Sequence, residues 1–397
     1  MGETRGVHSI HTNLEVLRNT MSEALADVPA DADLYLRPAA LTAPGPDALP
    51  LAGGAVAFGA VEVIAARYGD RIRHVTLAAE VAAAALTALP DPLAARAHAQ
   101  FERLIAPRPA MPLPGLDRSL SFARPLLMGV LNVTPDSFSD GGRHATPEQA
   151  VAHAEAMIQA GADIIDIGGE STRPGASPVW EGEERDRVLP VIERLAGCGA
   201  ALSIDSRNAS VMEAALQAGA HMLNDVSALA HDPRSLAVAA AASGPVVLMH
   251  SRGEPATMQQ DPTYDDVLLD VFDALAGRIA ACEAAGIDRA RLIVDPGIGF
   301  AKSLRHNLDL IDGLSLFHSL GCPLLLGVSR KTFIGALSRG EPPDGRLAGS
   351  LAAALAGLDR GGQVLRVHDV AETRQAVAVW QGLRDAAMLG SRETKKG

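Results

Sequence analysis

The sequence predicts an α/β protein whose larger part is a (β/α)8 TIM barrel, preceded by a small Ala-rich α/β-like N-terminal region. Two observations predict the barrel. Eight short apolar runs follow residue 120, and helical stretches separate them. Continuous apolar runs of this kind are typical of parallel strands that are buried on both faces. The runs end near residues 132, 169, 205, 225, 250, 295, 329 and 368. Most of these intervals leave room for a helix and two loops, as a barrel requires.

The N-terminal region has a different composition from the rest of the chain. Strong helix formers dominate residues 78–89 and 93–106, which predicts two helices, and the apolar run at 34–36 predicts a short strand. Four prolines between residues 107 and 114 exclude a helix there and predict a stiff, extended connector. We therefore expect two units, an N-terminal extension over residues 1–115 and a barrel over residues 121–390.

Composition excludes several classes of function. The 397 residues carry 35 basic and 47 acidic side chains, a net charge of −12, and only 3% are aromatic. Neither non-specific nucleic-acid binding nor attachment to an anionic membrane fits this balance. Three scattered cysteines predict neither a disulfide framework nor a zinc site, and no apolar signal opens the chain. We expect a cytoplasmic protein.

Each of the eight apolar runs has a defined place in the chain. The runs are LLMGVLN (126–132), DIIDIGG (163–169), ALSID (201–205), HMLND (221–225), PVVLMH (245–250), RLIVD (291–295), PLLLGVS (323–329) and QVLRVH (363–368). Neither a GxGxxG nor a phosphate-loop motif follows the first run, which favours a barrel over a doubly wound sheet.

Polar side chains stand at or beside the end of every run. They are Asn132, Glu170, Asp205, Asn224 with Asp225, His250, Asp295, Ser329 with Lys331, and Arg366 with His368. In a barrel these ends share the face where active sites are built. The Asp and Asn side chains suit a polar heterocycle, whereas the basic groups after the last two runs suit phosphate or carboxylate. Asp205 alone has a second interpretation, as the cap of a helix that starts near residue 208.

Two long loops follow the first two runs. TPDSFSDGGR (134–143) and STRPGAS (171–177) combine turn residues with hydroxyl groups. Loops of this kind over a barrel mouth either close as lids or hold a fixed shape, and composition does not separate the two.

The motifs resemble those of one enzyme family. MGVLNVTPDSFSDGG (128–142) and DIIDIGGESTRPGA (163–176) closely resemble the two signature segments of the dihydropteroate synthases. Shorter matches follow in the same order: SIDSRN (203–208), LNDVSAL (223–229), LMH (248–250), VDPGIGFAK (294–302), LLGVSRKTFIG (325–335), GRLAGSLAAAL (345–355) and LRVHDV (365–370). The resemblance covers about residues 121–390.

The resemblance implies a reaction and a set of site residues. Family members join 4-aminobenzoate to 7,8-dihydropterin-6-ylmethyl diphosphate, release diphosphate and form 7,8-dihydropteroate, and sulfonamides mimic 4-aminobenzoate. By resemblance, Asp205, Asn224, Asp295 and Lys331 recognise the pterin, and Asn132, Arg366 and His368 bind diphosphate. Thr172, Arg173, Pro174, Phe300, Ser329 and Lys331 surround 4-aminobenzoate. Asp295, Lys331 and Asn132 are the expected catalytic residues.

The resemblance also implies a metal and an assembly. Asn132 is the expected ligand of Mg²⁺, which prefers hard oxygen ligands and keeps several waters. Arg366 and His368 can stabilise the departing anion, and the pterin ring can stabilise the methylene cation of a dissociative, SN1-like route. An arylamine is neutral near pH 7, so no strong general base is needed. The implied partners are these small molecules and a second copy of the chain in a homodimer.

Departures from the family pattern leave two alternatives open. Ala301 replaces a frequent Gly, and most family members lack the N-terminal segment. The alternatives are a non-catalytic pterin-binding barrel and a methyltetrahydrofolate-type methyltransferase. A methyltransferase would share the pterin pocket but would not need SRK (329–331), RVH (366–368) or the 134–143 loop, and a binding module would have lost site positions.

Overall fold

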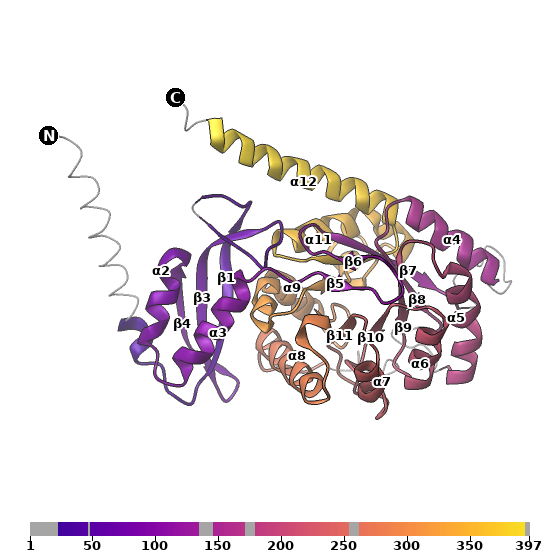
Figure 1. Cartoon of the computed structure of the whole chain (residues 1–397). Helices are drawn as coiled ribbons and strands as arrows, with labels where there is room; N and C mark the ends of the chain where they lie inside the picture. Colours follow the sequence, from indigo (N-terminus) through magenta and orange to yellow (C-terminus); the bar gives the residue numbers. More distant parts are fainter. Residues whose placement is uncertain (1–22, 47, 135–145, 171–178, 254–261, 394–397) are drawn as a thin grey trace.

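The computed structural model describes residues 23–46, 48–134, 146–170, 179–253 and 262–393. Two parts lie side by side in Figure 1, a small antiparallel sheet with two helices and a larger barrel. One cluster of buried apolar residues runs through both parts. The sheet and the barrel therefore share a continuous core.

The larger part is the TIM barrel that the apolar runs predict. Its strands are β7 (Leu126–Asn132), β8 (Ile164–Gly168), β9 (Ala201–Asp205), β10 (Met222–Asp225), β11 (Val246–Met249), β12 (Leu292–Asp295), β13 (Leu325–Leu326) and β14 (Val364–Val367). All neighbouring strands pair in parallel, in the order β12-β11-β10-β9-β8-β7-β14-β13. A parallel bridge between Val294 and Leu324 joins β12 to β13 and closes the ring. Each predicted run contains one strand.

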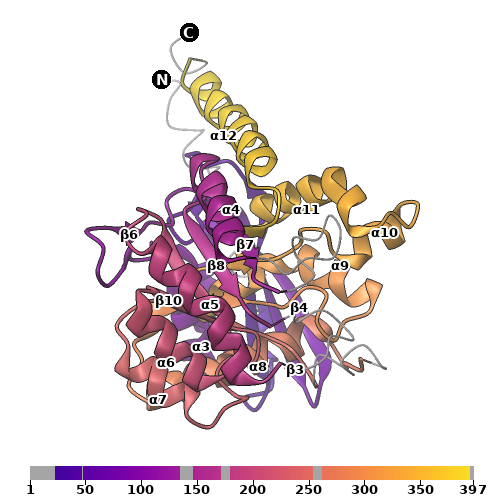
Figure 2. The same ribbon diagram turned by 90° about the vertical axis from the view of Figure 1, so that its right-hand side faces the viewer.

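Helices cover the outside of the barrel. They are α4 (Pro147–Gln159), α5 (Glu181–Leu195), α6 (Ala209–Ala218), α7 (Ser235–Ala241), α8 (Val267–Ala284), α9 (Leu304–Asp312), α10 (Thr332–Leu337), α11 (Leu347–Asp359) and α12 (Val370–Glu393), with short 3-10 turns η2 (Arg289–Arg291), η3 (Leu314–Leu320) and η4 (Pro343–Arg346). Figure 2 shows α4, α5, α6 and α7 side by side around the strands. Among the described residues, none of the helices combines the length and apolar character needed to cross a bilayer.

The segment between the two parts fills one end of the barrel. Strands β5 (Met111–Pro112) and β6 (Ser119–Leu120) form a short antiparallel hairpin. Its apolar residues pack into a cluster with inward-facing side chains of all eight barrel strands: Met111, Leu113, Leu120, Phe122, Leu126, Met128, Ile164, Ala201, Met222, Val247, Ile293, Leu325 and Val364. The proline-rich stretch contains no helix, as expected. Its role as a plug at the amino-terminal end of the barrel was not predicted.

The N-terminal part is a four-stranded sheet covered by helices. Strands β1 (Asp33–Thr42), β2 (Leu49–Pro50), β3 (Ala57–Arg67) and β4 (Asp70–Ala78) pair antiparallel, and β3 lies in the centre. Helix α2 (Ala79–Ala85), the turn η1 (Leu86–Ala88) and helix α3 (Leu93–Ile105) follow. The two predicted helices and the strand at 34–36 are therefore present. The long strands β3 and β4 were not predicted.

The barrel covers one edge of this sheet and leaves the other open. On β1, the carbonyls of Leu36 and Pro38 accept hydrogen bonds from the hydroxyls of Ser319 and Ser315 in η3. The Tyr35 hydroxyl donates to Asp273 in α8 at 2.7 Å. These bonds satisfy edge groups that would otherwise invite pairing with another chain. At the opposite edge, most of β4 is exposed.

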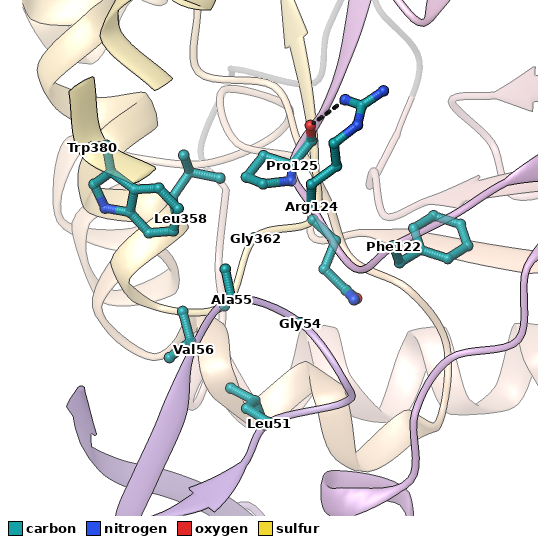
Figure 3. A pocket seen from close by; sticks show the side chains of 12 residues that line it. Leu51, Gly54, Ala55, Val56, Phe122, Arg124, Pro125, Leu358, Gly362 and Trp380 are labelled. Carbon is teal, nitrogen blue, oxygen red and sulfur yellow. Dashed lines mark hydrogen bonds between the residues drawn. The ribbon is translucent and has the colours of Figure 1, made fainter. Parts of the chain in front are cut away.

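A small pocket marks the junction of the two parts. Figure 3 shows Val56 of the N-terminal part, Phe122 of the linking segment, and Leu358 and Trp380 of the barrel helices around one space. The side chain of Gln363, at the start of β14, also lines it. Helix α12 adds a further link, because Arg384 donates to the carbonyl of Thr42 at 2.7 Å (Figure 1).

Candidate active site

A cavity of about 400 Å³ opens at the carboxyl ends of the barrel strands. Nine residues singled out in the sequence line it: Asn132, Asp205, Asn224, Asp295, Phe300, Ser329, Lys331, Arg366 and His368. The volume lies in the range of small-molecule sites. The structure therefore brings these nine side chains to one place.

The period of the strands explains this convergence. Alternate residues of a strand face opposite sides, so residues two apart share a face. In β12, Ile293 faces the apolar barrel interior, and Asp295 continues on the same face. In β14, Val364 and Arg366 have the same relation. The inward-facing residues are thus apolar at the start of these strands and polar at their ends. A polar layer therefore lies at the carboxyl end of the barrel, next to the apolar layer.

Asp295 and Lys331 both line the cavity, carry opposite charges and influence each other's pKa. Asp295 is 6% exposed and accepts a hydrogen bond from the Gly297 amide at 2.7 Å. Burial raises the pKa of the Asp295 carboxyl, against the lowering effect of that bond and of Lys331. Burial also lowers the pKa of Lys331 to about 8, although Asp295 opposes the shift. The Lys331 ammonium lies 4.1 Å from the centre of the Phe300 ring, in a cation–π contact.

Arg366 lies between two carboxylates. Its Nε donates to Asp166 and its Nη2 to Asp205, each at 2.7 Å. Burial lowers the pKa of Arg366, but the two carboxylates outweigh burial and raise it, so the guanidinium stays charged. Burial raises the pKa of Asp205 to about 7, with Arg366 opposing the shift and Asp166 adding to it. The Asn224 amide also donates to Asp166, at 3.0 Å.

Ser329 and His368 connect the last two strands at the cavity wall. The Ser329 hydroxyl lies 3.0 Å from Nδ1 of His368 and accepts from the His368 amide at 3.3 Å. Next to them, Arg330 forms an ion pair with Asp369. The basic side chains after the last two runs, Lys331, Arg366 and His368, therefore all line the cavity, together with Arg330.

Three polar residues at strand ends have structural contacts instead and do not line the cavity. Glu170 pairs with the buried guanidinium of Arg207. Asp225 accepts from the amides of residues 227 and 229. His250 lies 3.1 Å from the ammonium of Lys302, whose pKa burial lowers to about 7. A position at a strand end therefore does not by itself place a side chain in the cavity.

The helix-cap interpretation of Asp205 is wrong. Helix α6 begins at Ala209 with Asn208 as its N-cap, and the Asp205 carboxylate pairs with Arg366. Thr172, Arg173 and Pro174 lie outside the described residues, as do most of the 134–143 loop and all of the 171–177 loop.

Some residues around the cavity were not predicted. Thr332, Arg346 and Arg330 line it, and Asp166 supports it from below. Asp166 lies inside an apolar run rather than at its end. Asp166 is two residues from Ile164, which faces the barrel interior. Because residues two apart share a face of a strand, this spacing could have identified Asp166 as an inward-facing residue.

Asn132 is a candidate metal ligand at the cavity surface. Among the described residues, no group of three or more His, Cys, Asp or Glu side chains is placed to hold a metal by itself. Asn132 presents a single amide at the end of β7, on the cavity surface. A single amide oxygen fits Mg²⁺, which keeps several waters and binds substrate phosphate oxygens.

Comparisons with known proteins agree on one family. The model of the pterin-binding enzymes matches residues 128–368. The dihydropteroate synthase of Escherichia coli K12 is 47% identical over 279 residues, 70% of this chain and 96% of its own length. That of Neisseria meningitidis is 48% identical over 265 residues, 66% of this chain and 93% of its own length.

Solved structures give the same answer. The dihydropteroate synthase of Xanthomonas albilineans with 4-aminobenzoic acid has a TM-score of 0.65 and 49% identity, over 70% of this chain and 99% of its own. The Yersinia pestis enzyme in a sulfonamide complex has a TM-score of 0.66 and 46% identity, over 70% of this chain and all of its own. The X. albilineans enzyme has also been solved in complex with 7,8-dihydropteroate, with a TM-score of 0.63 and 47% identity over 70% of this chain and 99% of its own.

Proposed function

The chain belongs to the dihydropteroate synthase family of pterin-binding enzymes, and we propose how its cavity carries out the family reaction. It is a transferase that joins 4-aminobenzoate to 7,8-dihydropterin-6-ylmethyl diphosphate and forms 7,8-dihydropteroate and diphosphate. The observation that carries the assignment of roles is the convergence of nine site residues on one cavity.

The pterin binds in the deep, polar part of the cavity. The Asp295 carboxylate and the Asn224 amide oxygen accept hydrogen bonds from the ring N–H groups, and the Lys331 ammonium donates to ring acceptors. Asp205 adds a carboxylate on the other side of Asn224. Because Asp295 is buried, its interaction with a ring that becomes electron-poor is screened little by water.

The diphosphate lies against the basic wall formed by Arg366 and His368. Asn132 would hold a Mg²⁺ ion there, and the chemistry that such an ion would supply is neutralisation of charge on the leaving group. Arg366 is suited to this part because its own carboxylate partners keep it charged and in place. The Ser329 hydroxyl contacts Nδ1 of His368 and fixes the orientation of the ring at this wall.

The bond changes follow from this placement. The C–O bond of the exocyclic methylene breaks first, and its electron pair leaves with diphosphate. The amine nitrogen of 4-aminobenzoate then forms the new C–N bond and releases a proton. Phe300, with Lys331 over its ring, and Ser329 border the place of the arylamine. The resemblance to the family adds Thr172, Arg173 and Pro174, which lie outside the described residues. Sulfonamides are expected to occupy the same place.

Diphosphate release by the purified chain tests the proposal. The mixture contains the pterin diphosphate, Mg²⁺ and 4-aminobenzoate, and each is omitted in turn. Release that requires all three, with dihydropteroate as product, supports the reaction and the metal. Tight binding of the pterin diphosphate without turnover would instead favour a non-catalytic binding barrel. Methyl transfer from methyltetrahydrofolate would favour the other alternative.

The N-terminal extension is a packing element of the barrel rather than a second catalytic unit. It covers η3, whose residues are all buried, and the hairpin after it fills the barrel end. A chain shortened to begin at residue 110 keeps Met111 and should lose stability or change its assembly, while kcat stays within about threefold. A truncated chain with normal stability and assembly would contradict this role.

Assembly and location complete the proposal. We expect a homodimer, which sedimentation of the purified chain would test. We also expect a cytoplasmic enzyme, because all three cysteines are free thiols.

A further inference from the structure

A buried carboxylate below the cavity has contacts that the proposed reaction does not use. Asp166 lies in β8, has no solvent exposure and faces the barrel interior. It does not line the cavity. Any effect of Asp166 on substrate must therefore pass through the side chains that it contacts.

Asp166 contacts two residues of the site with one oxygen atom. Its Oδ2 accepts from Nδ2 of Asn224 at 3.0 Å and from Nε of Arg366 at 2.7 Å. Its Oδ1 is buried and has no hydrogen-bond partner among the described residues. A buried charge is costly unless charged donors compensate it, so the carboxylate depends on Arg366 as much as Arg366 depends on it.

We propose that Asp166 is a positioning residue of the pterin pocket, which fixes the orientation of the Asn224 amide and holds the Arg366 guanidinium before substrate binds. The inference rests on the proposed pterin site. It adds a residue that does not touch the pterin but determines how the Asn224 amide and the Arg366 guanidinium are oriented in the pocket.

The first part of the inference concerns Asn224. The oxygen and the NH₂ group of an amide have nearly the same size, so packing alone does not choose between the two orientations. An ionised carboxylate only accepts hydrogen bonds. Asp166 therefore holds the NH₂ group of Asn224 and leaves the amide oxygen as the remaining polar atom. A pterin ring presents N–H donors, and an oxygen is the atom that pairs with them.

The second part concerns Arg366. Asp205 and Asp166 bind different nitrogens of the guanidinium, and two contacts fix its plane. Asp205 lines the cavity and is available to substrate, whereas Asp166 is not. When substrate engages Asp205, the bond to Asp166 still holds Arg366 in place.

An exchange of donor and acceptor tests the first part. Asn224→Asp places a second carboxylate against Asp166, and we expect the Kd of the pterin diphosphate to rise about 100-fold. Adding Asp166→Asn removes the repulsion between the two carboxylates and lets the amide at residue 166 donate to the carboxylate at residue 224, which still presents an oxygen to the cavity. The recovery is partial, because the same atom of residue 166 also accepts from Arg366. The double variant should recover at least about tenfold of the lost affinity.

Ser203→Ala is the matched control for the second substitution. Ser203 pairs with Asp166 in the β8–β9 register and is equally buried, and its hydroxyl has no hydrogen-bond partner among the described residues. Combined with Asn224→Asp, it should recover no affinity. A double variant with Asp166→Asn that binds no better than Asn224→Asp alone would overturn the inference.

Asp166→Asn alone provides a test if Asn224→Asp does not fold. In folded protein, the KM of the pterin diphosphate should rise about tenfold while the KM of the arylamine substrate stays within about twofold. An unchanged pterin KM, or equal changes in both KM values, would overturn the inference. Absence of pterin-dependent turnover in the unmodified chain would instead overturn the proposed function.

Discussion

The two ends of the barrel are built from the same eight strands but differ in chemistry. At the amino-terminal end, inward-facing residues such as Ile293 and Val364 pack against the hairpin that contains Met111. Two residues further along the same strands, Asp295 and Arg366 line the cavity. Side chains alternate between the two faces of a strand, so the apolar and the polar residues of one strand both face inward when they are two residues apart. One of them stabilises the fold, and the other is placed to bind substrate. The two ends should therefore respond to substitution in different ways.

The largest expected effect is a loss of activity at the carboxyl end. Lys331→Ala removes a cation that lowers the pKa of Asp295 and lies over the Phe300 ring, and we expect kcat/KM for the pterin diphosphate to fall about 100- to 1000-fold. The thermal midpoint should change little, because Lys331 lines the cavity and is not part of the apolar core. Steady-state kinetics and thermal unfolding of the same preparation measure both. Normal kinetics would remove Lys331 from the site.

The opposite pattern is expected at the amino-terminal end. Phe122 is 3% exposed and belongs to the apolar cluster that fills this end. Phe122→Ala should lower the free energy of unfolding by about 3 to 4 kcal/mol. Urea unfolding gives that value, and kcat measured at low temperature should stay within about twofold. A large loss of kcat in folded protein would show that the two ends are coupled.

The sequence predicts the barrel well because its strands are buried on both faces. Each strand therefore appears as a short apolar run that a polar residue ends. A search for polar residues at the ends of runs misses Asp166, which lies inside its run. The same search selects Glu170 and Asp225, whose contacts are structural. The end of an apolar run shows where a strand leaves the apolar part of the barrel. Which polar side chains then line the cavity depends on their contacts with other strands, which the local sequence does not show.

Non-local pairing explains what the N-terminal sequence does not reveal. Strand β3 contains many alanines and β4 is mostly exposed, so neither has a clear alternation. Both are stabilised by pairing with each other and by packing against α2. The prolines near residue 110 exclude a helix, but nothing local shows that Met111 and Leu113 enter the barrel.

A smaller effect should appear in the pH dependence at the carboxyl end. Lys331 must be cationic to bind, and its pKa is lowered to about 8. The proton is lost as pH rises through this value, so kcat/KM should fall about tenfold per unit above pH 8. Measurement of kcat/KM from pH 6 to 10 gives this decrease as the alkaline limb of the profile. Lys331→Arg keeps its charge and should move the limb upward. An alkaline limb that does not move would assign it to another group.

The smallest effect concerns the backbone beside the cavity. Ala301 follows β12, is buried and has a φ of 51°, in the left-handed region that favours glycine. Its carbonyl accepts from the Tyr264 hydroxyl at 3.0 Å, a bond that does not depend on the side chain. Ala301→Gly should therefore raise the free energy of unfolding by about 0.5 kcal/mol, after the greater freedom of glycine in the unfolded chain is subtracted.

A second alanine gives the matched control for Ala301→Gly. Ala154 is equally buried, in the middle of the regular helix α4, where glycine costs about 1 kcal/mol. Substitution by glycine should thus change the free energy of unfolding with opposite signs at the two positions, as urea unfolding would measure. Loss of stability at both positions would mean that the turn after β12 is not strained. Gain at residue 301 would place backbone strain at the carboxyl end of the barrel, beside Phe300, where the surrounding contacts must maintain it.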